Sequence, residues 1–353
     1  MKYKFSILTN AFFAISGLFL FYMPDVSPEF FHLSVFFIFL IPVVIAINLF
    51  FVFYWLIRRP VYFCLISVAV LAAGYKYIDR TFSINFKNNE KGRFSVLSSN
   101  VRIFNVYSHL RDPDFSSSKE MIRWIKNNKA DILCLQEFYS NNSKELNSLN
   151  IIGSKYRYRY FVPFITIGNA KWGMVIFSKF PIVGRGDIKF REKSNNQILF
   201  CDIKIGRDTI RVYNIHLQSM SIDEGDIVNS KFDDESKDKL INVLLRYKNG
   251  SIQRSRQIKK LVQHIQSCPY KTIVCGDLNE LPYGYAYEQL SDLLDNSFQK
   301  AGTGFGFTYN GKLSFLRIDN QFADKKLEVN SFKVHNEIKY SDHYPVSASY
   351  SIR

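Results

Sequence analysis

The chain has 353 residues, which is enough for one large folded domain with an appendage, and its five cysteines show neither zinc-type spacing nor a disulfide framework. The formal net charge is +15, and because residues 1–79 hold five Lys/Arg against three Asp/Glu, +13 of it belongs to residues 80–353. A basic soluble region suits an anionic partner such as nucleic acid, an anionic lipid headgroup or a phosphate ester. Solubility alone is the alternative explanation of that charge.

Three apolar runs fill the N-terminal part of the chain, at about residues 5–23, 33–57 and 60–78. A membrane-spanning helix needs about 20 apolar residues, so the first two runs qualify and the third is marginal. A cleavable signal peptide is the alternative for the first run, but that run lacks a small-residue cleavage site and a second run follows directly. We predict a membrane region over residues 1–79 with three transmembrane helices, and with two as the alternative.

Charges in the short loops predict which side of the membrane each end faces. Lys2 and Lys4 precede the first run, Asp25 and Glu29 lie in the first loop, and the second loop carries two arginines at 58–59. The positive-inside rule places the N-terminus and the arginine pair in the cytoplasm. Three spans then place the rest of the chain outside, which in a bacterial cell means an inner-membrane protein with a periplasmic or exterior domain. Two spans would leave that domain in the cytoplasm.

The soluble region begins with a strand, a helix and a second strand. A polar linker over 80–93 leads to a strand over 94–102, and a capping box at 117–120 opens a helix. A buried strand over 130–137 follows and ends in an acid. This order is the start of an α/β layer, so we predict an α/β domain over residues 94–353.

The rest of the domain also consists of predicted strands and helices. The sequence predicts a surface excursion over 219–250, and these further elements: strands over 155–164 and 173–178, a hairpin of 198–205 with 209–217, helices over 236–247 and 251–267, a strand over 273–275, a helix over 285–294, and strands over 316–322 and after Pro345.

The strand at 273–275 leads directly into a group of polar residues. Gly276 is followed by Asp277, Leu278 and Asn279. Side chains two residues apart in an extended segment point to the same face, so Asp277 and Asn279 would sit side by side where the chain leaves the core. A carboxylate and a carboxamide held together there suit a phosphate and a hard cation. An Asx turn that closes the strand is the alternative.

Polar residues recur at the ends of other predicted strands: Asn100, Glu137, His216, Asp319, and Asp342 with His343. Open sheets place their sites at strand ends, so these residues and the Asp277–Asn279 pair predict one site. Glu137, Asp342 and Asn100 offer the oxygen ligands that Mg²⁺ prefers and leave positions for water and phosphate.

The remaining residues of this set supply proton transfer and phosphate binding. Asp277 or His343 can activate a water molecule. Asn279 and His216 can donate hydrogen bonds to phosphate oxygens and so stabilise the charge that develops in the transition state. We add Arg102, two positions after the strand-end asparagine, to the expected substrate-binding residues.

Seven short motifs in this region resemble, in order, those of the endonuclease/exonuclease/phosphatase superfamily, the DNase I-like metal-dependent phosphoesterases. They are Ser99-Asn100-Val101-Arg102, Leu135-Gln136-Glu137, Gly173 to Ser178 with Pro181, Asn214-Ile215-His216-Leu217, Gly276-Asp277-Leu278-Asn279, Arg317-Ile318-Asp319 and Ser341-Asp342-His343. Each motif is short, but their serial order across residues 94–353 is highly specific. The resemblance implies a four-layer α/β sandwich of two packed mixed sheets, with the site at one edge.

The resemblance also implies a role for each site residue. Glu137 would be the principal Mg²⁺ ligand with Asn100 and Asp342 nearby, Asp277 would orient or deprotonate the attacking water, Asn279 and His216 would bind phosphate, and His343, paired with Asp319, would act as acid/base or hold the scissile phosphate. Mn²⁺ is the alternative cofactor.

Two functions of different classes follow. The first is a membrane-tethered, Mg²⁺-dependent phosphoesterase that hydrolyses a phosphodiester or phosphomonoester by in-line attack of water. Its substrate would be nucleic acid or a phospholipid, sphingolipid or inositol phosphate headgroup; the anchor favours lipids and the basic charge suits both. The second is a non-catalytic, membrane-tethered binding module, a pseudoenzyme, which would require the loss of Glu137, Asp277 or His343, and none is missing. The sequence indicates no protein partner.

Overall fold

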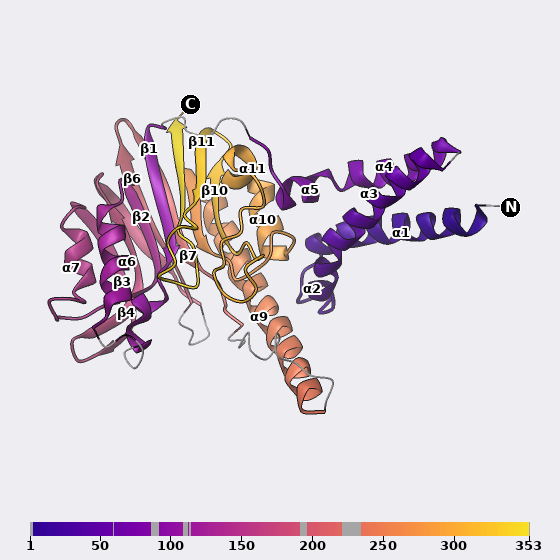
Figure 1. Ribbon diagram of the computed structural model, residues 1–353. Helices are drawn as coiled ribbons and strands as arrows, with labels where there is room; N and C mark the ends of the chain where they lie inside the picture. The colour runs from indigo at the N-terminus through magenta and orange to yellow at the C-terminus, as the bar shows by residue number, and fades with distance from the viewer. Residues whose placement is uncertain are drawn as a thin grey trace.

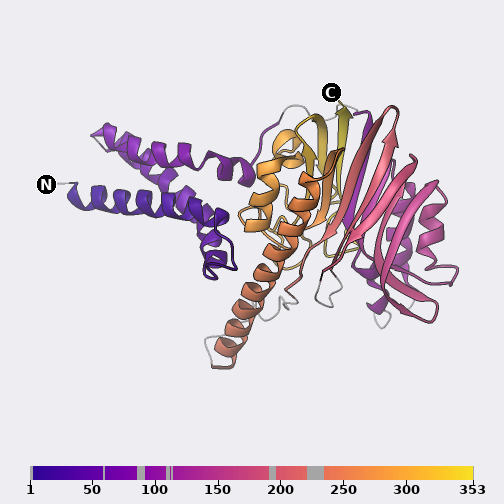
Figure 2. The ribbon, with the colours of Figure 1, turned by 180° about the vertical axis from the view of Figure 1, so that it is seen from behind.

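A computed structural model of the chain consists of a group of N-terminal helices and a larger α/β body beside it (Figures 1 and 2). Lys2 and Arg59, which entered the orientation argument, lie outside the described residues. The structure describes residues 3–58, 60–85, 92–108, 112, 114–190, 196–220 and 234–352.

Two of the N-terminal helical segments are long and apolar enough to cross a membrane, Lys4–Asp25 and Ser34–Ile57. The first contains α1 (Lys4–Tyr22) and η1 (Met23–Asp25), and the second contains α2 (Ser34–Phe37), η2 (Ile38–Leu40) and α3 (Ile41–Ile57). The third apolar run forms η3 (Val61–Phe63), α4 (Cys64–Ala73) and α5 (Tyr75–Thr81), and it bends by 68° between α4 and α5. The described residues therefore hold two candidate spans, or three if the bent pair is one span.

Helix α5 packs against the α/β body rather than continuing the apolar run. Arg80 is buried and pairs with Glu288 of α10 (Tyr285–Leu293) at 2.5 Å, and Lys76 reaches the other oxygen of the same carboxylate at 2.6 Å. Arg317 donates to the Arg80 carbonyl from within the body. Buried, paired charges hold their partners in one arrangement, so the last of the N-terminal helices is fixed to the α/β body.

Two six-stranded mixed sheets form the centre of the body, in the orders β11-β12-β1-β2-β4-β3 and β5-β6-β7-β8-β10-β9. The pairs β1/β2 and β7/β8 are parallel. The strands are β1 (Phe94–Asn100), β2 (Ile132–Ser140), β3 (Tyr158–Ile167), β4 (Ala170–Ser178), β5 (Ile182–Ile188), β6 (Gln197–Ile205), β7 (Asp208–His216), β8 (Lys271–Asp277), β9 (Leu294–Asn296), β10 (Asp319–Asp324), β11 (Leu327–Val334) and β12 (Val346–Ile352).

Helices cover the outer face of each sheet and complete four layers (Figure 1). Helices α6 (Ser116–Asn127) and α7 (Ser148–Gly153) lie on the first sheet, and α9 (Asp234–Gln266) with α10 lies on the second. Alternation along a strand divides the apolar residues between layers: Val96 packs between the sheets, whereas Leu97 packs under α6. The predicted four-layer sandwich of two packed mixed sheets is confirmed.

Three buried cysteines, Cys134, Cys201 and Cys275, belong to the apolar cluster between the sheets. Burial raises the pKa of the Cys201 thiol to about 12. A thiol of that kind is unreactive at neutral pH, so these residues serve as small hydrophobic side chains, as the sequence predicts.

Two helices differ from the prediction. The capping box was expected at 117–120, but Asp112 caps α6, since its carboxylate accepts from the backbone N–H groups of Ser116 and Ser117 at 2.9 Å. The two helices expected at 236–247 and 251–267 are one helix, α9, that continues through Gly250. A glycine inside a helix costs only about 1 kcal/mol, which the packing of the following turns onto the second sheet outweighs.

The structure also contains elements that the sequence did not indicate. These are α7, β5, β9, α11 (Ser297–Ala301), β11 and η4 (Arg102–Ser108).

Candidate active site

The parallel strand pairs bring the polar strand ends to one edge of the body. The register pairs His216 of β7 with Asp277 of β8, and Asp277 in turn with Asp319 of β10. The other sheet contributes Asn100, whose amide nitrogen donates to Glu137 Oε1 and to Asp277 Oδ2, both at 3.2 Å. This amide joins the edges of the two sheets, so the predicted residues meet in one place.

Glu137 owes its position to a β-bulge in β2. The register with β4 shifts between Leu135 and Phe138, and Glu137 adopts φ 48°, a left-handed conformation that non-glycine residues rarely take. The preceding Gln136 points between the sheets and donates to the buried Asn214 at 2.6 Å. The bulge therefore directs the carboxylate of Glu137 to the edge while its neighbour stays in the core, and such strain is typical of functional sites.

Asp277 is almost fully buried and is held by its own turn. Its Oδ1 accepts from the backbone N–H of Asn279 at 2.7 Å, and the Asn279 amide donates to Leu217 O at 3.0 Å and to Asp277 Oδ2 at 3.2 Å. The Asx turn and the site are thus the same feature. Burial raises the pKa of Asp277, with the neighbouring His343 opposing that effect. A carboxylate with a raised pKa is a better proton acceptor.

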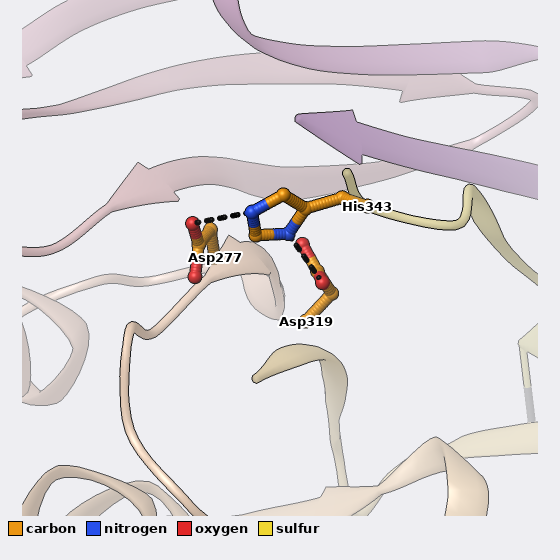
Figure 3. Close-up of side chains that lie close together, drawn as sticks. All are labelled: Asp277, Asp319 and His343. Carbon is orange, nitrogen blue, oxygen red and sulfur yellow. Dashed lines mark hydrogen bonds and ion pairs between the residues drawn. The ribbon is translucent and has the colours of Figure 1, made fainter. Parts of the chain in front are cut away.

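His343 lies between two carboxylates (Figure 3). Its Nδ1 is 2.8 Å from Asp319 Oδ2, and its Nε2 is 3.8 Å from Asp277 Oδ2. The backbone N–H of Asp319 donates to the Thr308 hydroxyl at 3.0 Å, which helps to place that carboxylate. Burial alone would lower the pKa of His343, but the charges of Asp319 and Asp277 outweigh burial and raise its pKa to about 10. The ring is therefore an imidazolium at neutral pH.

His216 is buried, yet neither of its ring nitrogens makes a hydrogen bond within the part of the chain that the structure describes. Its Nε2 is 3.6 Å from Glu137 Oε1 and 3.7 Å from Asp277 Oδ2. Buried polar atoms without partners are uncommon in folded proteins. His216 also lines the cleft described below, so both ring nitrogens are available to a ligand there.

Asp342 and Arg102 form the rim of the site. Arg102 Nε is 3.4 Å from Asp342 Oδ2, and more than half of the Arg102 side chain is exposed. The Ser341 hydroxyl donates to the backbone oxygen of Asn100 at 2.8 Å and lies 3.2 Å from Asp342 Oδ1. The structure thus brings seven of the nine predicted residues into the centre and places these two at its edge.

A cleft of about 770 Å³ opens onto Glu137 and His216. One wall is apolar and carries Ile165 and Trp172 from the β3–β4 hairpin. The opposite wall is α9, which contributes Arg246 among others. A cleft with one apolar wall and polar groups on the other wall and at its floor is typical of a small-molecule site.

The donor set at the floor fits a hard divalent cation, because carboxylate oxygens are the ligands that Mg²⁺ prefers. Ligand atoms of Asp277, Asp319 and His343 lie within 4.8 Å of one another. Because the Nδ1 of His343 is already paired with Asp319, the carboxylate of Glu137, which is 30% exposed to the cleft, is the better anchor. Asn100 faces it with the amide nitrogen, so it would have to turn over to ligate a cation through oxygen.

Sequence reasoning missed the supports of this site. Gln136 and Asn214 were part of the motifs but were given no function, although the Asn214 amide bridges the sheets by donating to Leu135 O and Val175 O. Thr308 and Arg246 carried no motif at all. The contribution of Thr308 and Arg246 depends on tertiary contacts. For Asn214 the signal in the sequence was an amide between the apolar residues Tyr213 and Ile215.

The sequence profile of the endonuclease/exonuclease/phosphatase family matches residues 103–343. A second profile, of a domain of unknown function, matches residues 3–81. No curated protein sequence matches the chain significantly.

Several solved structures share the fold. An endonuclease/exonuclease/phosphatase from Bacteroides vulgatus is 15% identical with a TM-score of 0.52, over 74% of this chain and 99% of that chain. Truncated TDP2 from Caenorhabditis elegans is 21% identical with a TM-score of 0.50, over 73% and 97% of the two chains. A mannosyl-6-phosphatase from Bacteroides thetaiotaomicron is 15% identical with a TM-score of 0.50, over 73% and 99%. At these identities the likeness shows the fold alone.

Proposed function

Because this chain belongs to the endonuclease/exonuclease/phosphatase family, whose members act on phosphate ester bonds, we propose that it is a membrane-anchored, divalent-metal-dependent phosphoesterase that hydrolyses its substrate by attack of water. The observation that carries this proposal is the convergence of a buried basic carboxylate, Asp277, and a buried imidazolium, His343, beside the carboxylate of Glu137.

Glu137 would hold the cation, with Asn100 and Asp342 as the further candidate ligands. When bound, Mg²⁺ or Mn²⁺ would neutralise charge on the phosphate and lower the pKa of a bound water. The fit is one of donor chemistry: acidic oxygens at the floor of a cleft that is large enough to admit a phosphate ester.

The protein groups divide into a base and hydrogen-bond donors. Asp277 accepts the proton of the attacking water, because burial makes its carboxylate more basic and Asn279 fixes its orientation. The raised pKa of His343 favours its charged form, so we assign it to stabilising the negative charge of the phosphate and, held by Asp319, to protonating the leaving oxygen. His216 donates to the phosphate oxygens, with Arg102 at the rim. Asn279 joins it only by releasing one of its amide bonds to Leu217 O and Asp277 Oδ2.

The N-terminal helices would anchor the enzyme in the membrane. With the bent third run as a span, the positive-inside rule places the domain on the periplasmic or exterior side of a bacterial inner membrane. A topology reporter fused to the C-terminus is expected to be active outside. Activity only in the cytoplasm would exclude the three-span arrangement.

The activity test uses the full-length protein in detergent with Mg²⁺ and a panel of plasmid DNA, RNA, phospholipids, sphingomyelin, inositol phosphates and sugar phosphates. We expect Glu137→Gln to reduce turnover on the order of a hundredfold or more while the melting temperature stays near that of the wild type. The matched control is Glu145→Gln, an exposed glutamate in the loop after β2. Near-wild-type turnover in Glu137→Gln would refute the assignment.

A further inference from the structure

The first half of α9 exposes a run of large aliphatic side chains. Leu240, Ile241, Leu244 and Leu245 are 46%, 53%, 42% and 45% exposed. They share one side of the helix with Tyr247, because residues three, four and seven apart lie on the same face. A soluble surface rarely gathers so many large apolar residues, so this face is suited to an apolar environment.

The same half of α9 forms one wall of the catalytic cleft with its other side. Arg246, Asn249 and Gly250 line the cleft. Successive residues are about 100° apart around a helix, which places Arg246 and Asn249 roughly opposite the Leu240–Leu244 stripe. Whatever covers the apolar face therefore lies just behind the cleft wall.

Contacts place this helix beside the membrane region. The Tyr247 ring lies 6.0 Å from the Phe36 ring and 5.1 Å from the Phe39 ring, both at the start of the second apolar segment. Farther along α9, Arg256 and Lys259 pair with Glu29 of the loop between the first two segments, at 3.0 and 2.7 Å. The apolar face is thus continuous with residues at the end of the spanning segments.

The orientation of α9 agrees with these contacts. In both views α9 runs across the direction of α1 and α3, on the side of the α/β body from which those helices extend (Figures 1 and 2). If α1 and α3 cross a bilayer, a helix that lies at the end of these spans and across their direction is placed to lie along the membrane surface.

The charge of this segment suits anionic lipid. Residues 237–248 contain four basic side chains and one acidic side chain, a net charge of +3: Lys237, Lys239, Arg246 and Lys248 against Asp238. At 100° per residue, Lys239 and Arg246 lie on the polar side, whereas Lys237 and Lys248 flank the ends of the apolar face, from where long lysine side chains reach lipid headgroups. Leucine-rich amphipathic helices that carry such basic residues bind in the interface of anionic bilayers. A second copy of the same face would instead set like charges against each other.

We propose that residues 237–248 of α9 lie in the membrane interface beside α2, so that the catalytic cleft opens at the bilayer surface. This inference rests on the proposed function, and it assigns the phosphate ester hydrolysed in that cleft to the headgroup of a membrane lipid. Arg246, which lines the cleft from the interfacial helix, is placed to attract an anionic headgroup.

The interface is tested by spin-label accessibility in the full-length protein, reconstituted in vesicles of phosphatidylethanolamine and phosphatidylglycerol. Nitroxides are attached at Leu244→Cys and, as the matched control on the opposite side, at Asn242→Cys, in a Cys268→Ala background because the other four cysteines are buried. We expect the label at 244 to be relaxed by oxygen and shielded from an aqueous nickel chelate, and the label at 242 to show the reverse. Circular dichroism checks that both variants fold.

Two results would overturn the interfacial placement. Equal access of the nickel chelate to both labels would mean that the face is in water. Shielding of the label at 244 from both reagents would mean that protein, such as a second copy, covers it.

The lipid assignment is tested by comparing two substrates in the same vesicles, phosphatidylglycerol and the water-soluble bis(4-nitrophenyl) phosphate. The double change Leu240→Asp and Leu244→Asp is expected to reduce turnover of the vesicle lipid on the order of tenfold relative to the soluble ester, and Asn242→Asp is the control. Equal effects on both substrates would overturn the lipid assignment. If the wild type cleaves neither of these two but does cleave a water-soluble ester of the activity panel, the lipid assignment alone is overturned. Failure on the whole panel would refute the phosphoesterase proposal, and the difference between the two spin labels would still test the interfacial placement.

Discussion

Removal of the carboxylate beside His343 is the sharpest test of the site's electrostatics. In Asp319→Asn, the Nδ1 of His343 loses an anionic partner at 2.8 Å and keeps Asp277 at 3.8 Å on its other side. The difference between the ordinary pKa of 6.5 and about 10 corresponds to roughly 5 kcal/mol in favour of the imidazolium. Loss of one close opposite charge usually shifts a pKa by about 1 to 3 units, so the pKa of His343 should fall toward neutrality.

The assay is the pH dependence of kcat/KM. If His343 acts as an imidazolium, activity declines only as the pH rises through its pKa, and the alkaline limb should move to lower pH in Asp319→Asn. Asp324→Asn, at the other end of β10, is the control. An unchanged alkaline limb would refute the reasoning, and so would an NMR titration that found His343 neutral at pH 7 in the wild type.

The same pair also contributes to stability. Because the pKa of His343 is higher in the folded protein than in the unfolded chain, its contribution is complete below about pH 6.5 and disappears as the pH rises through about 10. Asp319→Asn should therefore lower the melting temperature at neutral pH, with a smaller difference from the wild type near pH 10.

Three further changes test the framework of the site. Gly276→Ala should cost at least about 2 kcal/mol in denaturant unfolding, because the added carbon would lie 2.0 Å from Ile215 O at a φ of +141°. Glu288→Gln should cost about 3 to 5 kcal/mol, since it leaves the buried Arg80 guanidinium unpaired. Burial alone would raise the pKa of Glu288, but Arg80 and Lys76 outweigh burial and lower it below 4.5. The wild type therefore keeps the stabilisation from the Arg80–Glu288 pair above pH 4.5 and loses it as the pH falls through the lowered pKa. The variant should show no such loss in acid melts. Asn214→Leu should cost about 1 to 3 kcal/mol for each carbonyl that it leaves unpaired, measured by thermal unfolding.

The convergence of the polar residues at the strand ends was predictable because parallel pairing brings these ends to one edge of a sheet, independently of the conformation of the loops. His216 and Asp277 are opposite each other in the register of β7 and β8, so two residues in separate motifs had to meet. The motif order then located the other sheet's contribution, Glu137 and Asn100. These parts of the site depend only on sequence alternation and topology.

The parts that escaped prediction depend on contacts that short-range patterns do not contain. Strand β5 was missed because Gly184 and Gly186 interrupt it, and glycine is uncommon in strands. The bulge holds Glu137 in a left-handed conformation, which usually calls for glycine. The segment Leu135-Gln136-Glu137 contains no glycine that would predict it. The cap of α6 is contributed by Asp112, which lies outside the helical pattern.

The ion pair between Arg80 of α5 and Glu288 limits how far the α/β body can move from the N-terminal helices. A flexible linker would let a domain sweep a volume whose radius grows with the square root of linker length. Here the Arg80–Glu288 pair fixes the last N-terminal helix to the α/β body. In the anchored arrangement that we propose, the active site stays at a fixed distance from the bilayer. Encounters then occur by lateral diffusion in two dimensions, and a phosphate ester free in solution must come to the membrane to be cleaved.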